Sequence, residues 1–184
     1  IIWIMSEDYL KLHDDACVVD LHIHPALKLS LFHRNLSDKH KLGLFARASW
    51  PFATRTDFPK MVEGGLDVGL SVIYIPEAGW FDDIPILGLA KYLKPGTWKK
   101  MASVTFFQGA MNAMDEMEKQ VDGWNNSGLT ESRRRISFAK SPFELKEKVD
   151  SGDLCLVHAV EGAHHLHGEV GGKRAGDSIY STDE

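Results

Sequence analysis

Residues 17–23, Cys-Val-Val-Asp-Leu-His-Ile, form an apolar, β-branched run that decides the fold of this chain. Two similar runs follow, DVGLSVIYI at residues 67–75 and LCLVHAV at residues 154–160. Continuous apolar runs of this length are typical of strands that are buried on both faces in a parallel sheet. Helix-forming segments separate them, so we expect an α/β fold in which the three strands are adjacent and parallel.

Capping residues and apolar spacing predict the remaining elements. Pro25 ends the first strand, and residues 25–54 are expected to be a long connection. A brief strand is predicted at residues 135–139. The predicted helices cover residues 6–13, 56–64, 84–93, about 97–124, and 142–150, the last opened by a capping box at Ser141. In the longest helix a stripe at helical spacing is expected to face the core: Met101, Val104, Ala110, Met111, Met114 and Met117.

Composition excludes several classes of protein. The 184 residues include 21 Lys and Arg against 26 Asp and Glu, a net charge of −5, so we expect no nucleic-acid partner. The basic run Arg133–Arg135 is expected to be a solvated turn. No stretch approaches the about 20 apolar residues of a membrane span. The isolated Cys17 and Cys155 favour a reducing compartment, and we expect a cytoplasmic protein.

The first strand carries a His-x-His motif at its carboxyl end, His22 and His24. Strand alternation predicts that Asp20, His22 and His24 share one face. Two imidazoles at this spacing can converge on a metal ion, and chemistry in parallel β/α folds gathers at the carboxyl ends of strands. The alternative is a pair of histidines that are hydrogen-bonded in a polar rim. Asp20 is a candidate for orienting a ligating imidazole.

The third strong strand is followed by Glu161, a carboxylate that needs a partner after an apolar run. Alternation places Glu161 on one face and His158 on the other, so His158 is expected to be structural. Three histidines of the following loop are expected to be surface imidazoles that could also line the site: His164, His165 and His167. The sequence has no GxSxG, Walker or GxGxxG motif, which leaves a metal site as the strongest hypothesis.

Three segments resemble the membrane dipeptidase (renal dipeptidase) family of the amidohydrolase superfamily: VVDLHIHP at 18–25, TDFPKMVEGGLDVGLSVIYIP at 56–76, and LVHAVEGAHHL at 156–166. The resemblance implies a TIM-type (β/α)₈ barrel that holds two zinc ions. It implies that His22 is a metal ligand and that Glu161 is the catalytic carboxylate bridging both ions. His24 stands where dipeptidases carry an aspartate, and it is expected to ligate metal as well.

The family's remaining ligands come from later strands, so we expect residues 1–184 to be the amino-terminal part of a single barrel, inactive alone. The complete protein is expected to hydrolyse peptide or amide bonds of a small substrate with a metal-bound hydroxide. Other amidohydrolase activities, on esters, lactones or acetylated substrates, are the first alternative. A non-catalytic fragment that serves as an assembly module is the second. A homodimer is compatible with either.

Overall fold

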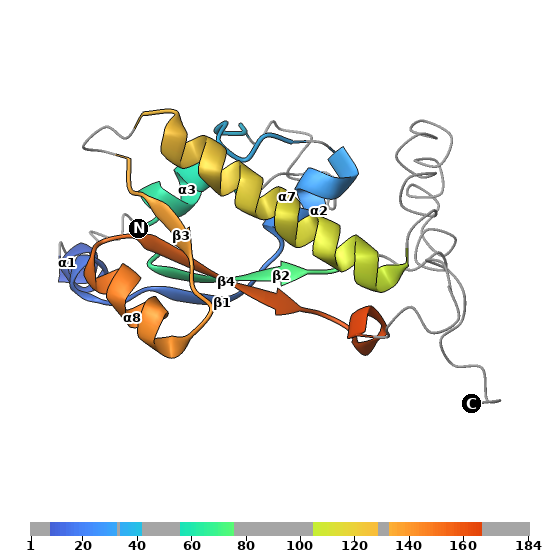
Figure 1. The fold of residues 1–184 in the computed structure, drawn as a ribbon. Coiled ribbons are helices and arrows are strands. Elements are labelled where there is room, and N and C mark those ends of the chain that lie inside the picture. The colour runs from blue at the N-terminus through green and yellow to red at the C-terminus, as the bar shows by residue number, and fades with distance from the viewer. Residues whose placement is uncertain (1–7, 33, 42–55, 76–104, 129–132, 167–184) are drawn as a thin grey trace, which may run out of the picture.

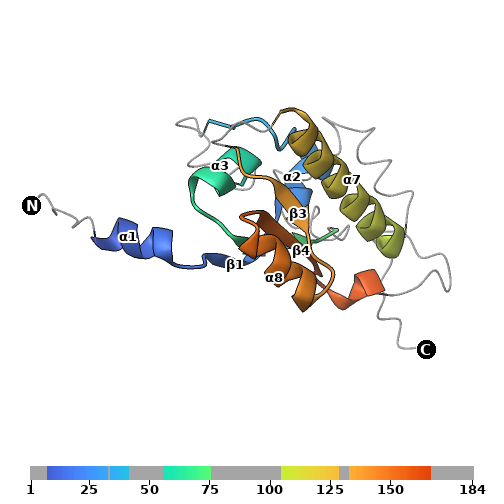
Figure 2. The same cartoon turned by 60° about the vertical axis from the view of Figure 1, so that its left-hand side comes forward.

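The structure is a computed structural model that describes residues 8–32, 34–41, 56–75, 105–128 and 133–166 (Figures 1 and 2). Its strands are β1 (Val19–Ile23), β2 (Val68–Ile73), β3 (Ile136–Phe138) and β4 (Leu154–Val160). Its helices are α1 (Asp8–Asp15), α2 (Pro25–Phe32), α3 (Phe58–Glu63), α7 (Phe106–Asn126), α8 (Pro142–Asp150) and the 3₁₀ helix η1 (Ala163–Leu166). The predicted helix at 84–93, and residues 97–104 of the next one, lie outside the described residues.

The four strands form one parallel sheet in the order β1-β2-β4-β3. The prediction that the three strong strands are adjacent and parallel is confirmed. β3 lies outside β4 and pairs only with its first half, residues 154–156. The connection from β2 to β3 passes β4 in one direction, and the connection from β3 to β4 returns in the opposite direction. Because crossover connections between parallel strands are right-handed, the helices of these two connections, α7 and α8, lie on opposite faces of the sheet (Figure 1).

The core lies between the sheet and α7. Met117 and Trp124 of α7 are buried against Ile136, Leu154 and Leu156 of the sheet. The predicted stripe is therefore correct at Ala110 and Met117. It is wrong at Met111, which is 40% exposed, because the buried face runs instead through the small residues Gly109 and Ala113.

The segment after Pro25 is helical, which corrects the prediction of a long connection from residue 25. α2 begins at Pro25 and ends at Phe32, and its residues Ala26 and Leu29 are buried in the core. Proline is favoured in the first turn of a helix, where its missing N–H has no intrahelical acceptor. Pro25 thus ends β1 and begins α2 at once.

Helix α8 begins where its predicted cap places it, whereas α3 begins at Phe58, two residues after the predicted start, because Asp57 is its N-cap. Ser141 caps α8 by accepting a hydrogen bond from the Glu144 backbone N–H at 3.2 Å. Asp57 caps α3 through the Lys60 backbone N–H at 3.0 Å, and its buried carboxylate also pairs with the Lys60 ammonium at 2.7 Å. In the described part of the chain, none of the helices has the length and apolar character that crossing a bilayer requires.

The basic run is not a solvated turn at Arg134. Its guanidinium donates to the carbonyls of Leu66, Gly152 and Asp153 at 3.0–3.1 Å and pairs with the Asp67 carboxylate at 2.9 Å. These partners precede β2 and β4, so Arg134 links the loops at the amino end of the sheet. Arg135 is mostly exposed, in line with the prediction.

Candidate metal site at the carboxyl end of the sheet

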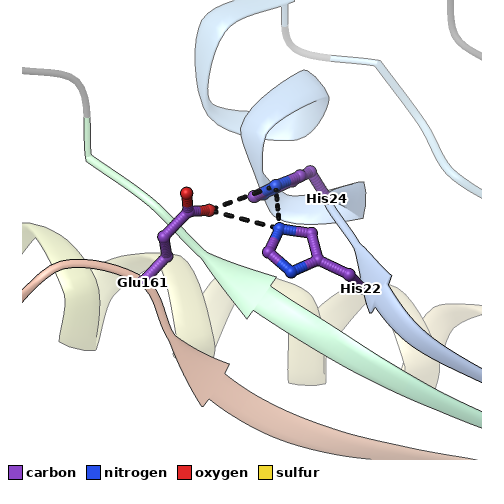
Figure 3. Close-up of side chains that lie close together, drawn as sticks. All are labelled: His22, His24 and Glu161. Carbon is purple, nitrogen blue, oxygen red and sulfur yellow. Dashed lines mark hydrogen bonds and ion pairs between the residues drawn. The ribbon is translucent and has the colours of Figure 1, made fainter.

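Three side chains converge at the carboxyl end of the sheet: His22, His24 and Glu161, here called the His–Glu cluster (Figure 3). The Nε2 atoms of His22 and His24 lie 3.4 and 3.3 Å from Glu161 Oε2. The two imidazole Nε2 atoms lie 2.9 Å apart and share a hydrogen bond. The structure thus brings together the three residues that the sequence predicts as metal ligands.

An irregularity in β1 puts His22 on the same face as Glu161. Asp20 pairs with Gly69, whereas Ile23 pairs with Ser71, so three steps along β1 match two steps along β2. Paired residues of neighbouring strands share a face. Regular pairing would have set His22 opposite Ser71, on the α7 face. A bulge of this kind re-aims a side chain, as bulges next to active sites often do.

The same irregularity corrects the prediction that Asp20 shares the face of His22. Asp20 pairs with Gly69, two residues from Ser71 on the same face of β2. Its carboxylate accepts a hydrogen bond from the backbone N–H of His22 at 3.0 Å. The expected role of orienting an imidazole is therefore replaced by a contact with the backbone of the bulge.

Glu161 is placed by regular pairing between β4 and β2. Val160 pairs with Ile73, and the ladder continues one step further because the Glu161 N–H donates to the Ile73 carbonyl at 3.0 Å. Residues of β4 that share the face of Glu161, such as Val157 and Ala159, alternate with the α7-facing residues. This pattern agrees with the alternation that the sequence predicts for β4.

The donor set and its spacing fit a zinc ion. Ligand atoms held about 2.0–2.2 Å from a tetrahedral ion lie roughly 3.3–3.5 Å from one another. Both imidazole-to-carboxylate distances match this spacing, and the imidazole pair is closer because it shares a hydrogen bond. The side chains of His22 and Glu161 are 58% and 45% exposed, so the cluster is open on one side.

His158 lies away from the cluster, as predicted. Its ring stacks on Phe138 at 4.1 Å between centroids, and its Nε2 lies 3.7 Å from Glu118 of α7. Burial lowers the pKa of His158, and the attraction of Glu118 offsets only part of this effect. The neutral ring therefore belongs to the packing between β4, β3 and α7.

The prediction of a surface imidazole is wrong for His165, which is 1% exposed. Its ring lies between Tyr74 and Phe106, with centroids 6.0 and 6.1 Å away. No local pattern distinguishes it from its neighbours, because Ile75, its hydrogen-bond partner, lies 90 residues earlier. The side chain of His164 and all of His167 lie outside the described residues.

Comparisons with known proteins find likenesses among solved structures. No family model matches the chain, and no curated protein matches it. Among solved structures, the chain is similar to the crystal structure of the dipeptidase AC, a metallopeptidase of family M19. The identity is 17% and the TM-score 0.44, over 81% of this chain and 36% of that one. The chain thus spans little more than a third of the matched protein.

Proposed function

We propose that the His–Glu cluster binds a zinc ion and is part of the active site of a metal-dependent hydrolase acting on peptide or amide bonds. The observation that carries the proposal is the convergence of two imidazoles and one carboxylate, whose ligand atoms lie within 4.8 Å of one another. They meet at the carboxyl end of a parallel sheet, where α/β enzymes place their chemistry.

Two histidines and one glutamate are a ligand set that zinc hydrolases use, with the fourth position left for water or substrate. Zinc bound there would supply a Lewis acid that polarises a carbonyl and lowers the pKa of a coordinated water. The exposure of His22 and Glu161 leaves room for a substrate on the open side of the cluster. The carboxylate of Glu161 supplies the negative charge that offsets the charge of the cation.

The finer parts of the proposal come from the resemblance in sequence. It favours a dipeptide as the substrate and a second zinc ion that shares Glu161. Further ligands for that ion would come from beyond residue 184, so the chain would be the amino-terminal part of a (β/α)₈ barrel. The position of β1 at the edge of the sheet that the described residues form supports this, because a barrel would require a further strand beside it.

The test is a metal titration of the full-length protein, purified without chelators and then stripped. We expect wild-type protein to bind zinc, to give the visible spectrum of four-coordinate cobalt when loaded with that metal, and to hydrolyse amide substrates. His22→Ala should lose both metal binding and hydrolysis. The matched control is His13→Ala, which removes an exposed histidine that contacts the Gly64 carbonyl, far from the cluster.

The substrate panel separates the alternatives. Dipeptides, acetylated amino acids, esters and lactones should be compared at equal metal loading. A preference for esters or lactones would favour another amidohydrolase activity over the proposed peptidase activity. Metal binding without hydrolysis of any of these substrates would contradict the proposal that the protein is an enzyme. Wild-type protein that binds neither zinc nor cobalt would contradict the whole proposal and support a non-catalytic module.

A further inference from the structure

The side chain of His165 links the loop that carries Glu161 to the end of β2. Its Nε2 accepts a hydrogen bond from the backbone N–H of Ile75 at 2.8 Å. Its Nδ1 lies 3.0 Å from the carbonyl oxygen of Gly162, the residue that follows Glu161. The ring thus spans between two segments that flank the His–Glu cluster.

These two partners fix the protonation of the ring. A backbone N–H can only donate and a carbonyl can only accept, so Nε2 carries no proton and Nδ1 carries one. The ring is buried to 1% exposure between Tyr74 and Phe106. A neutral imidazole with both nitrogens bonded can be buried at little cost, whereas an unbonded polar ring could not.

The His165 ring also replaces a backbone acceptor in the hydrogen-bond ladder between β2 and β4. In a parallel pair the hydrogen bonds are evenly spaced. After the bond from the Glu161 N–H to Ile73, the next would join the Ile75 N–H to the Glu161 carbonyl. The Ile75 N–H bonds His165 instead, because the chain turns at Gly162, whose φ is 92°, a value that favours glycine.

We infer that His165 is a positioning residue for Glu161. This inference rests on the proposed metal site, because Glu161 is useful there only if its carboxylate stays close to the two imidazoles. Without the imidazole, the loop from Gly162 onward loses its bond to β2, and among the described contacts the backbone of Glu161 is tied to β2 through the bond to Ile73. The carboxylate then samples positions farther from His22 and His24.

The experiment compares metal affinity in the full-length protein, by competition between zinc and a chromogenic chelator. His165→Ala should weaken zinc binding by about 10- to 100-fold, the loss typical of groups that orient a ligand. His165→Gln places an amide oxygen where it can accept from Ile75 and should recover most of the affinity. His158→Ala is the matched control: it removes another largely buried histidine that faces α7.

The visible spectrum of bound cobalt provides a second measurement, and a general loss of stability would leave this spectrum of the folded protein unchanged. The spectrum of folded His165→Ala should differ from wild type, whereas that of His158→Ala should not. Wild-type affinity and an unchanged spectrum in folded His165→Ala would overturn the inference. An equal loss of affinity in both alanine variants would also overturn it, since the effect would then be general destabilisation.

Two measurements on wild-type protein remain decisive if His165→Ala does not fold. Nitrogen NMR of the ring should show a proton on Nδ1 and none on Nε2, and the Ile75 amide should exchange slowly with solvent. A proton on Nε2 or fast exchange would overturn the inference. Neither measurement depends on metal, so failure of the proposed function would appear separately, as absence of zinc binding in wild type.

Discussion

The amino end of the sheet is held by Arg134, whereas its carboxyl end carries the His–Glu cluster. Each bond that Arg134 makes joins a cationic donor to a carbonyl or a carboxylate, so its charge is compensated. In the cluster, three groups that commonly ligate metals lie within 4.8 Å of one another. Among the described residues, the Glu161 carboxylate pairs with these two imidazoles and with no Lys or Arg.

This difference separates groups that stabilise the fold from groups that could perform chemistry. Arg134 joins three loops that are distant in sequence, and a displacement of any of these loops would break hydrogen bonds of its guanidinium. The cluster is more exposed, and its three members come from two strand ends that are already fixed by pairing. We therefore expect changes at the carboxyl end to affect metal binding and changes at the amino end to affect stability.

The largest effect is expected for Glu161→Gln. A neutral amide cannot offset the charge of a cation, so zinc affinity should fall strongly. We expect a loss of more than about 100-fold, which is the upper end of the loss seen when a residue that only orients a metal ligand is mutated. The free energy of unfolding without metal should change by less than about 0.5 kcal/mol, because the side chain is exposed. Zinc competition and urea unfolding test the two parts. Unfolding at much lower urea would show that Glu161 also supports the fold.

Arg134→Ala should show the opposite pattern. Losing the ion pair with Asp67 and three bonds to carbonyls should lower the free energy of unfolding by about 2–3 kcal/mol. Zinc affinity of the folded protein should remain as in wild type. The control is Arg135→Ala, whose guanidinium is exposed and lies 3.9 Å from Asp153, with an expected change below about 0.5 kcal/mol. Equal losses in both variants would contradict the role of Arg134.

Much of the sheet could be predicted because its signals are local. β4 has the predicted bounds, since an apolar run lies between Gly152 and Gly162, and the cap at Ser141 sets the start of α8. The strand ends alone predicted that His22, His24 and Glu161 lie at the same end of the sheet, but their shared face also depends on the bulge in β1. The bulge in β1 could not be predicted, because it depends on how β1 pairs with β2.

Arg134 and His165 were misjudged for a related reason. Their partners lie up to 68 and 90 residues away, and nothing in the flanking sequence marks them. A short basic run and a histidine-rich loop are usually exposed, so local composition predicted exposed side chains at both positions. Only the folded arrangement of the loops shows which members of each group are used.

Asp57 extends the comparison to a second carboxylate, one that is fully buried and fully paired. Burial raises its pKa, but hydrogen bonds from Lys60 and the His40 backbone N–H, with the charge of Lys60, hold the pKa below its usual 3.8. Asp57 therefore stabilises the fold above about pH 3.8, and this stabilisation is lost as pH falls through the lowered pKa.

The measurement is urea unfolding of wild type and Asp57→Asn between pH 7 and pH 2.5. At neutral pH we expect the variant to be less stable by about 1–2 kcal/mol, because it keeps the cap but loses the charge. The difference should shrink below pH 3.8. A difference that stays constant over this range would mean that the ionised form of Asp57 contributes no stability.

The smallest effect is expected for Leu21→Thr. The Leu21 side chain on edge strand β1 is 68% exposed, contrary to the expectation that the apolar residues of this strand are covered by helices. In the 184-residue chain the change should alter the free energy of unfolding by less than about 0.5 kcal/mol. In a longer protein with a further strand beside β1, it should cost more. Unfolding curves of both lengths test this, and equal small effects would argue against a covered β1.

The pairing of β2 with β4 has a consequence for how the site forms during synthesis. His22 lies near the start of the chain and Glu161 near the end of the described residues. At a rate of about 5–20 residues per second, the carboxylate leaves the ribosome roughly ten seconds after the imidazoles. During that interval the two histidines form an incomplete pair. Glu161 joins them only when β4 inserts beside β2, so binding of a metal ion by all three side chains, as proposed above, would require the completed sheet.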